Sequence, residues 1–239
     1  MVVPEYYAKR PEMGLDEGTL REFERLYGEQ VEGGTGREIE YGLSVPKWKF
    51  LCWLCEAEDV VLHGSGDGTI EEFEPRQPGD EGEFSGQKAV FAASDGLWPM
   101  FFAVVNRDGV GGPVQSLVNA CFRLVEEDGG LSDPYYFLSI NGDALEEGAV
   151  TWRDAWIYLL PKRSFVQRPR KKQDGGEIDI QEWASLVPVK PLAKIRVGPG
   201  DFPLLKEVRG HDLKVIIERL KRNPGGFPWL EPSPGLAPA

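Results

Sequence analysis

The sequence predicts an α+β fold, and three observations support this prediction. Apolar residues make up 41% and aromatic residues 11% of the 239 residues, which is typical of a folded globular chain. Apolar residues at helical spacing come early in the chain, whereas short apolar runs typical of strands dominate later. Strands and helices do not alternate regularly, which disfavours a parallel sheet built from βαβ units.

Residues 1–45 are expected to form an N-terminal extension around one helix. Thr19 and Glu22 have the spacing of a capping box, and the apolar residues that follow share one helical face. Gly28 and the stretch Gly33–Gly36 are then expected to end the helix, because glycine favours the conformation found just after a helix terminus.

The main domain is predicted to span residues 46–222, followed by a Pro- and Gly-rich tail over 223–239. Pro46 suits the first position of a helix, and Ser94 or Asp95 suits the N-cap of a later one. The predicted helices cover residues 46–55, 98–105, 114–126 and 212–222, and the predicted strands cover 60–62, 88–93, 135–140, 155–160, 181–189 and 192–197.

Composition also bounds the partners and the location. The chain has 39 acidic and 27 basic residues, a net charge of -12, which repels phosphate backbones and disfavours nucleic-acid binding. The longest notable apolar run, Trp98–Val105, is too short to span a membrane. The first residues lack the apolar region of a signal peptide, and three cysteines, an odd number, suit a reducing cytosol. We therefore expect a cytoplasmic protein.

His63 is the first candidate site residue. It follows a predicted buried strand and precedes Gly64 and Ser65. Glycine lets a ligand approach backbone N–H and C=O groups, which suit an amide-bearing ring, and the imidazole can hydrogen-bond a sugar hydroxyl. The structural alternative is a histidine that packs over a turn at the end of a strand.

An aromatic pair and a carboxylate complete the candidate site. Phe91 lies on a predicted strand and Phe102 on the helix after it, so their rings can hold a flat heterocycle; alternatively, both belong to the core. Glu182 opens a later predicted strand, where a carboxylate can stabilise a developing cation or accept a proton. The alternative for Glu182 is a solvated surface residue.

In this order, the segments Leu62–Ser65, Gly86–Ala92 and Gln181–Trp183 resemble the His/aromatic/Glu pattern of the ADP-ribosyltransferase superfamily, which includes the poly-ADP-ribose polymerases. The resemblance covers roughly residues 59–197. It implies a split two-sheet α+β core that binds NAD in the crevice between the sheets. N-terminal helices and a C-terminal helix would flank this core.

The resemblance also implies a role for each residue. His63 would bind the nicotinamide-side ribose, and the Gly64 backbone would bind the nicotinamide amide. Phe91 and Phe102 would stack on the nicotinamide ring. Glu182 would hold the ribose 2′-hydroxyl and stabilise the oxocarbenium-like transition state as nicotinamide leaves.

Some positions depart from the family pattern or extend it. The family commonly has tyrosine where Phe91 and Phe102 stand, and phenylalanine retains the stacking without the hydroxyl. Ile180 stands where arginine-modifying members carry glutamate, so arginine-directed transfer is not expected. Ser65 and Arg76 complete the predicted cofactor-binding set. Arg76 can meet a pyrophosphate, or it can form a surface salt bridge.

Two further motifs are assigned structural roles. Cys52 and Cys55 lack the second pair of ligands that zinc requires, and their spacing places both on one buried helical face, so no metal site is predicted. The basic run Arg168–Lys172 is expected to be a solvated loop, or else to dock an acidic partner near Glu182.

Two hypotheses follow. The first is an enzyme that cleaves the nicotinamide–ribose bond of NAD and transfers the ADP-ribose to an acceptor such as a protein, or to water. The second is a non-catalytic domain that binds a nucleotide or a protein partner through the same cleft. A cleft with His63 and Glu182 facing each other would favour the first. A cleft plugged by the N-terminal helix or the Pro-rich tail, or Glu182 turned to solvent, would favour the second.

Overall fold

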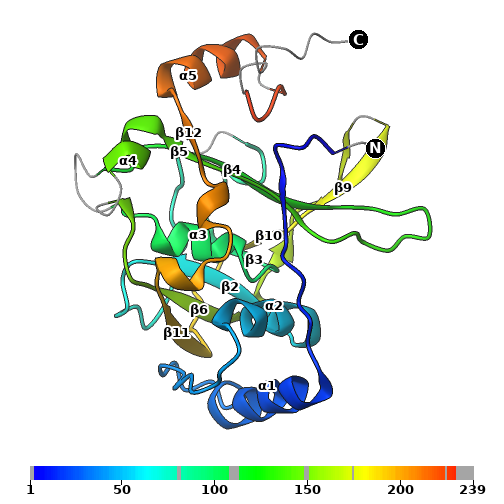
Figure 1. Ribbon diagram of the computed structural model, residues 1–239, viewed down its shortest axis with the longest axis vertical. Helices are drawn as coiled ribbons and strands as arrows, with labels where there is room; N and C mark the ends of the chain where they lie inside the picture. Colours follow the sequence, from blue (N-terminus) through cyan, green and yellow to red (C-terminus); the bar gives the residue numbers. More distant parts are fainter. Residues whose placement is uncertain are drawn as a thin grey trace.

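The computed structural model describes residues 3–79, 82–107, 113–147, 151–173, 175–223 and 225–229. These residues form two largely antiparallel six-stranded sheets and five α-helices (Figure 1). The predicted α+β class is therefore confirmed. Helix α3 lies between the two sheets, and its apolar residues share one core with both of them.

Sheet B holds the strands that carry the candidate site. Its strand order is β11-β6-β2-β3-β10-β7. The bounds are β2 Val60–Ser65, β3 Val90–Ala93, β6 Ala155–Pro161, β7 Val166–Gln167, β10 Glu182–Ser185 and β11 Ala193–Val197. The five predicted strands that fall in this sheet all exist, although the one expected over 181–189 ends earlier, at Ser185.

Sheet A has the strand order β1-β5-β4-β9-β8. Strand β1 pairs with the start of β5, and β12 pairs in parallel with its end, Ser139–Asn141. The bounds are β1 Ala8–Lys9, β4 Leu117–Leu124, β5 Tyr135–Asn141, β8 Lys171–Gln173, β9 Gly176–Ile180 and β12 Arg209–His211. This sheet therefore combines strands from nearly the whole length of the described chain.

The helices are α1 Glu17–Gln30, α2 Lys47–Ala57, α3 Trp98–Val104, α4 Gly142–Glu147 and α5 Leu213–Arg222. Short 3-10 helices cover Lys162–Ser164, Pro199–Asp201 and Leu205–Glu207. Three of the four predicted helices are confirmed, with Asp212 accepting hydrogen bonds at the start of α5. The N-terminal segment runs along the molecule from β1 to α1 at one end, and α5 lies at the other end (Figure 1).

The predicted start of the first helix was wrong, and the helix ends at Gln30, between Gly28 and the Gly33–Gly36 stretch that were expected to stop it. The N-cap is Asp16, whose carboxylate accepts a hydrogen bond from the Thr19 N–H at 2.7 Å. A carboxylate is as good a cap as a hydroxyl, so the helix begins earlier than the Thr19 box predicted. Gly28 lies inside α1, because the buried side chains of Phe23 and Leu26 hold the helix against the core.

The helix predicted over 114–126 is also wrong, since this segment contains strand β4. Leu117, Val118, Cys121 and Phe122 have spacings that resemble one helical face. In the structure both faces of β4 are covered: Cys121 belongs to the central core, and Val118 packs in a second cluster with Ile216. Apolar residues on both faces remove the period-two signal by which an amphipathic strand is recognised.

Asp95 joins the end of β3 to sheet A. Its carboxylate accepts hydrogen bonds from the N–H groups of Leu97 and Trp98 at 2.8 and 2.7 Å, just before α3. The hydroxyl of Tyr136, on β5, donates to its second oxygen at 2.6 Å. The N-cap of α3 is Leu97, so the N-cap predicted at Ser94 or Asp95 was wrong. Asp95, which is 2% exposed, instead bonds the backbone where the chain enters the helix.

The chain crosses between the sheets twice within a short stretch. It leaves sheet B after β7, enters sheet A at β8, and returns from β9 to β10 through Gln181. The Gln181 N–H donates to the Cys121 carbonyl in sheet A, and the Gln181 carbonyl accepts from the Ser94 N–H beside sheet B. Gln181 is thus hydrogen-bonded to both sheets.

Asp179 connects the two crossings. Its carboxylate, which is 6% exposed, accepts hydrogen bonds from the side chains of Gln167 at 2.8 Å and Gln181 at 2.6 Å. It also pairs with Arg170 at 3.2 Å. The outgoing and the returning segments are therefore fixed to the same buried carboxylate.

The two ends of the described chain pack on the domain. Phe23 of α1 contacts Phe50 and Trp53 of α2, so the 1–45 extension contributes to the central core. From the predicted tail, Phe227 packs edge-on against Phe137, with ring centroids 5.6 Å apart, and residues 230–239 lie outside the described residues. Among the helices that the structure describes, none has the length and hydropathy needed to cross a bilayer.

Asp179→Ala is expected to lower the free energy of unfolding by about 3 kcal/mol, because it leaves Arg170 and two amides without their buried acceptor. Asp154→Ala is the matched control. Asp154 pairs with Arg196 on the surface, and the pair is about 60% exposed on both sides, so its loss should cost at most about 0.5 kcal/mol. Urea unfolding followed by circular dichroism measures both changes, and equal effects would contradict the role of Asp179.

Candidate functional site

The predicted site residues lie on neighbouring strands. Strand β3 pairs with β2 on one side and with β10 on the other. His63 is on β2, Phe91 on β3 and Glu182 on β10, so three segments far apart in the sequence lie side by side in sheet B.

The strand register separates His63 from Glu182. Leu62 pairs with Ala93, and Ala93 pairs with Glu182, so these three side chains share one face of sheet B. His63 is one residue further along β2 and therefore lies on the opposite face, where it contacts Phe73 at a centroid distance of 4.7 Å. The two residues do not face each other across a slot.

His63 is fixed by a hydrogen bond to β3. Its Nδ1 lies 2.6 Å from the carbonyl oxygen of Phe91. Because a carbonyl only accepts, Nδ1 carries the proton and Nε2 of the neutral ring presents a lone pair. Burial lowers the pKa of the imidazole below its usual value, the nearby Arg76 charge acts in the same direction, and the bond to Phe91 opposes both.

Gly64 provides close packing for a helix. A Cβ at this position would lie 2.0 Å from the Pro99 carbonyl oxygen and 2.9 Å from the Ala103 nitrogen, both in α3. Glycine is therefore required for the approach of α3 to β2, whether or not a ligand binds there. The next residue, Ser65, accepts a hydrogen bond from the Asp67 N–H at 3.1 Å and so stabilises the turn after β2.

Phe91 and Phe102 are part-buried, and each ring has a different neighbour. The Phe91 ring lies 6.5 Å from that of Phe84, whereas the Phe102 ring contacts Trp98 and Phe101 at 5.9 and 5.8 Å. No contact between the Phe91 and Phe102 rings is found among the described residues.

Arg168 pairs with Glu182 and partly covers it. Its guanidinium nitrogen lies 2.8 Å from the carboxylate, and the Glu182 side chain is 15% exposed. The same guanidinium lies 5.9 Å from the centre of the Phe84 ring, and Phe84 in turn contacts Phe91. Phe84, Phe91, Arg168 and Glu182 therefore form a connected cluster, which we name the Arg168 cluster.

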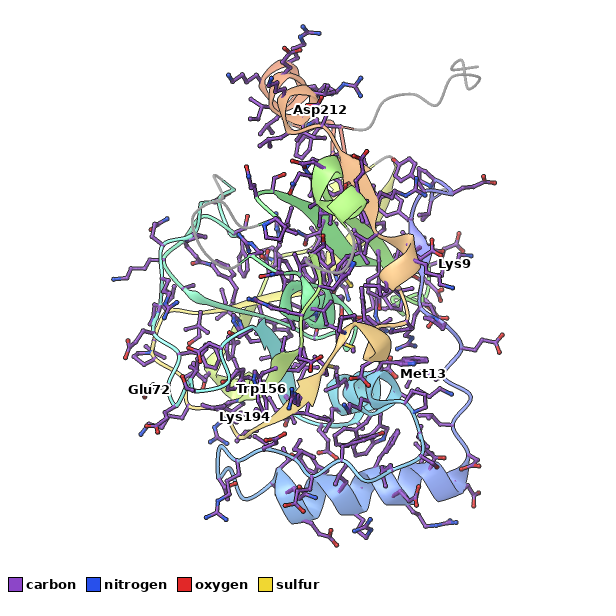
Figure 2. The ribbon with its side chains drawn as sticks, turned by 60° about the vertical axis from the view of Figure 1, so that its left-hand side comes forward. Lys9, Met13, Glu72, Trp156, Lys194 and Asp212 are labelled. Carbon is purple, nitrogen blue, oxygen red and sulfur yellow. The ribbon has the colours of Figure 1, made fainter. Side chains whose placement is uncertain are left out.

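Positive side chains gather near the end of β2. Arg76 is exposed and makes no ion pair with any described residue. The pKa of Asp67 is lowered mainly by its hydrogen bonds from Thr69, and the Arg76 charge acts in the same direction. Lys194 hydrogen-bonds the Gly68 carbonyl and lies 5.1 Å from the centre of the Trp156 ring. Figure 2 shows Trp156 and Lys194 beside each other. Asp67, Glu71, Glu72 and Glu74 lie in the same loop and are exposed, so the charge near the end of β2 is mixed.

The second histidine, His211 on β12, has a structural environment. Its Nδ1 lies 2.8 Å from the Ser139 hydroxyl, which donates onward to the Arg209 carbonyl, and its Nε2 lies 2.8 Å from the Ser116 hydroxyl. Both ring nitrogens are therefore hydrogen-bonded. Burial lowers the pKa of this imidazole as well, while Asp212 acts in the opposite direction.

The cysteines lie in the core. Cys52, Cys55 and Cys121 are free thiols, all buried, and burial raises the pKa of each. Their environment agrees with the predicted packing role of Cys52 and Cys55. In the part of the chain that the structure describes, no group of three or more His, Cys, Asp or Glu side chains is arranged to hold a metal ion.

Sequence reasoning missed Phe84 and the pairing of Arg168. Phe84 lies in a loop between charged and glycine residues, outside any periodic pattern, and Arg168 begins a run read as a solvated loop. Shallow hollows lie at the start of α1, beside Asp16 and Glu22, and at the β8–β9 hairpin, and neither is lined by residues of the Arg168 cluster.

No protein-family model, curated protein or solved structure gave a significant match to this chain.

Gly64→Ala is expected to lower the free energy of unfolding by about 2–3 kcal/mol, because the new methyl group collides with the backbone of α3. Gly28→Ala is the matched control. A Cβ at Gly28 meets nothing within 4 Å and the residue is helical, so alanine should stabilise by about 0.5–1 kcal/mol. Thermal unfolding distinguishes the two, and a stable, native-like Gly64→Ala would contradict the packing role.

Both histidines are expected to titrate below the usual pKa of about 6.5 in the folded protein. Because the folded pKa is lowered, the stability that each contributes is present above about pH 6.5 and is lost as the pH falls below that value. NMR titration of the two imidazole signals, assigned with His63→Asn and His211→Asn, measures the pKa values. A midpoint at or above 6.5 for either ring would contradict its burial.

Proposed function

We propose that this chain is an ADP-ribosyltransferase-like protein that binds NAD and cleaves the bond between nicotinamide and ribose, passing ADP-ribose to an acceptor. The observation that carries the proposal is the position of His63, Phe91 and Glu182 on the adjacent strands β2, β3 and β10, with the His63 N–H bonded to the Phe91 carbonyl. The resemblance implies that these three residues lie close together, and the strand order of sheet B supports this part of the proposal, whereas its register places His63 and Glu182 on opposite faces.

The proposed roles follow from the chemistry of each group. The unprotonated Nε2 of His63 accepts a hydrogen bond from a ribose hydroxyl. The Gly64 backbone binds the nicotinamide amide, and Phe91 and Phe102 offer apolar faces to the ring. Glu182 stabilises the positive charge that develops on the ribose as the C–N bond breaks and nicotinamide leaves with the bonding electrons.

The remaining steps involve the acceptor and the phosphates. The acceptor, a protein side chain or water, attacks the same ribose carbon and loses a proton. Arg76 supplies a positive charge for the pyrophosphate of NAD. Ser65, at the turn after β2, belongs to the same proposed binding set. We place the reaction in the cytoplasm, where NAD is available and the three buried thiols remain reduced.

Turnover requires the Arg168 cluster to open. Arg168 neutralises Glu182, and Phe84 lies against the Phe91 ring that would stack on nicotinamide. His63 and Glu182 also lie on opposite faces of sheet B. A ligand that contacts both must therefore reach around the strand ends, or the strands must shift.

The same geometry favours a second candidate function, a non-catalytic domain that binds a nucleotide or a protein partner. The specific observation is the 2.8 Å ion pair that holds Glu182 on Arg168. In this alternative, His63 and Arg76 bind the ligand. Glu182 has a structural role, since its ion pair joins β10 to Arg168, which directly follows β7.

The test is nicotinamide release from NAD by the purified protein, with Glu182→Gln as the variant and Glu177→Gln as the control. Glu177 pairs with Arg170 near the same edge but lies in sheet A, so its loss should leave release within about twofold. Glu182→Gln should reduce release at least 100-fold, as expected for the loss of charge stabilisation in a transition state.

Calorimetric titration with NAD separates the two candidate functions. Binding without nicotinamide release, unchanged in Glu182→Gln, would support the non-catalytic domain. The absence of both binding and release would contradict the NAD proposal in either form.

A further inference from the structure

The edge shared by the two sheets has a distinct surface. Strand β7 is the last strand of sheet B and β8 is the last strand of sheet A, and both belong to residues 162–173. We name this stretch the basic edge. It contains six of the 27 basic residues of the chain and none of its 39 acidic ones; the six are Lys162, Arg163, Arg168, Arg170, Lys171 and Lys172.

The most exposed large apolar side chains of the described residues lie at the same edge. They are Val166, Leu186 and Val187, which are 71%, 66% and 57% exposed. Val166 on β7 pairs with Ala184 on β10, and Leu186 and Val187 directly follow β10. Aliphatic groups exposed together and bordered by charge are typical of a protein-binding surface.

Some basic residues of this edge form ion pairs within the protein, and others have no carboxylate partner among the described residues. Arg168 pairs with Glu182, and Arg170 pairs with Glu177 and Asp179. Three other basic residues of this edge are exposed and have no carboxylate partner among the described residues: Arg163, Lys171 and Lys172. Lys162 lies over the Trp183 ring at 4.9 Å.

The backbone of this edge can also accept a partner. The Arg168 N–H donates to the Glu182 carbonyl, and hydrogen-bonded positions alternate along an antiparallel strand. The N–H and C=O of Gln167 therefore point away from β10, and no described strand pairs with that side of β7. An extended segment can lie along β7 and use these groups.

We propose that the basic edge, together with Val166, Leu186 and Val187, binds an extended acidic protein segment that carries aliphatic side chains between its carboxylates. The carboxylates pair with the free lysines and arginine, and the aliphatic groups cover the three exposed side chains. Charge complementarity selects such a segment, because a second copy of this edge would be repelled. Nucleic acid fits less well, since aliphatic side chains offer bases no stacking surface.

The proposal is independent of NAD cleavage and is tested by fluorescence anisotropy with a labelled 12-residue peptide of alternating Glu and Val. The expected result is saturable binding that weakens at least tenfold for Lys171→Glu/Lys172→Glu and for Leu186→Gln. Lys221→Glu/Arg222→Glu and Leu213→Gln are the matched controls on α5, where the affected side chains are also exposed. They should change the affinity by less than twofold.

Two additional probes complete the experiment, with circular dichroism to verify that each variant is folded. A peptide of alternating Lys and Val should not bind, and a 12-nucleotide single-stranded RNA should bind at least tenfold more weakly than the acidic peptide. The proposal is overturned if the acidic peptide does not bind, if the edge variants bind it like the wild type, or if the RNA binds equally well.

Discussion

The buried carboxylate of Asp179 is the constraint on which the arrangement of the two sheets depends. The chain passes from sheet B to sheet A and back within twenty residues, and Asp179 holds both passages through Gln167, Arg170 and Gln181. Because it is buried and multiply bonded, its hydrogen-bond geometry is more restrictive than that of a surface ion pair. The position of β10, and with it Glu182, follows from this junction.

The candidate site combines two features of the same sheet. Strand order brings the three motifs together, whereas side-chain alternation assigns His63 and Glu182 to different faces. Two of the site residues are positioned by backbone groups. His63 is hydrogen-bonded to the Phe91 carbonyl, and Gly64 packs against the backbone of α3. Arg168 pairs with Glu182 and partly covers it, so the segment after β7 limits the exposure of this carboxylate on β10.

Much of the fold could be predicted from local signals, and the remainder depends on partners distant in the sequence. Strands with a continuous apolar run, such as β2 and β6, and the amphipathic α5 were identified correctly. β4 was mistaken for a helix because both its faces are covered, and the two- and three-residue strands β1, β7, β8 and β12 have no pattern of their own. For the site, the order of motifs indicated their proximity, but their faces depend on register, which sequence alone does not contain. The pairing of Arg168 with Glu182 could not be predicted either, because it also depends on the register between β7 and β10.

The participation of β11 and β12 has a consequence for synthesis on the ribosome. Sheet B includes Ala193–Val197, and sheet A includes Arg209–His211, which pairs with β5 and is bonded to it through His211. Neither sheet can be complete before these late segments have emerged from the exit tunnel. The apolar strands β5 and β6 therefore remain partly unpaired until β12 and β11 have been translated. Such a nascent chain would be a natural client for chaperones that bind unpaired strands, and its yield in a host would depend on elongation rate.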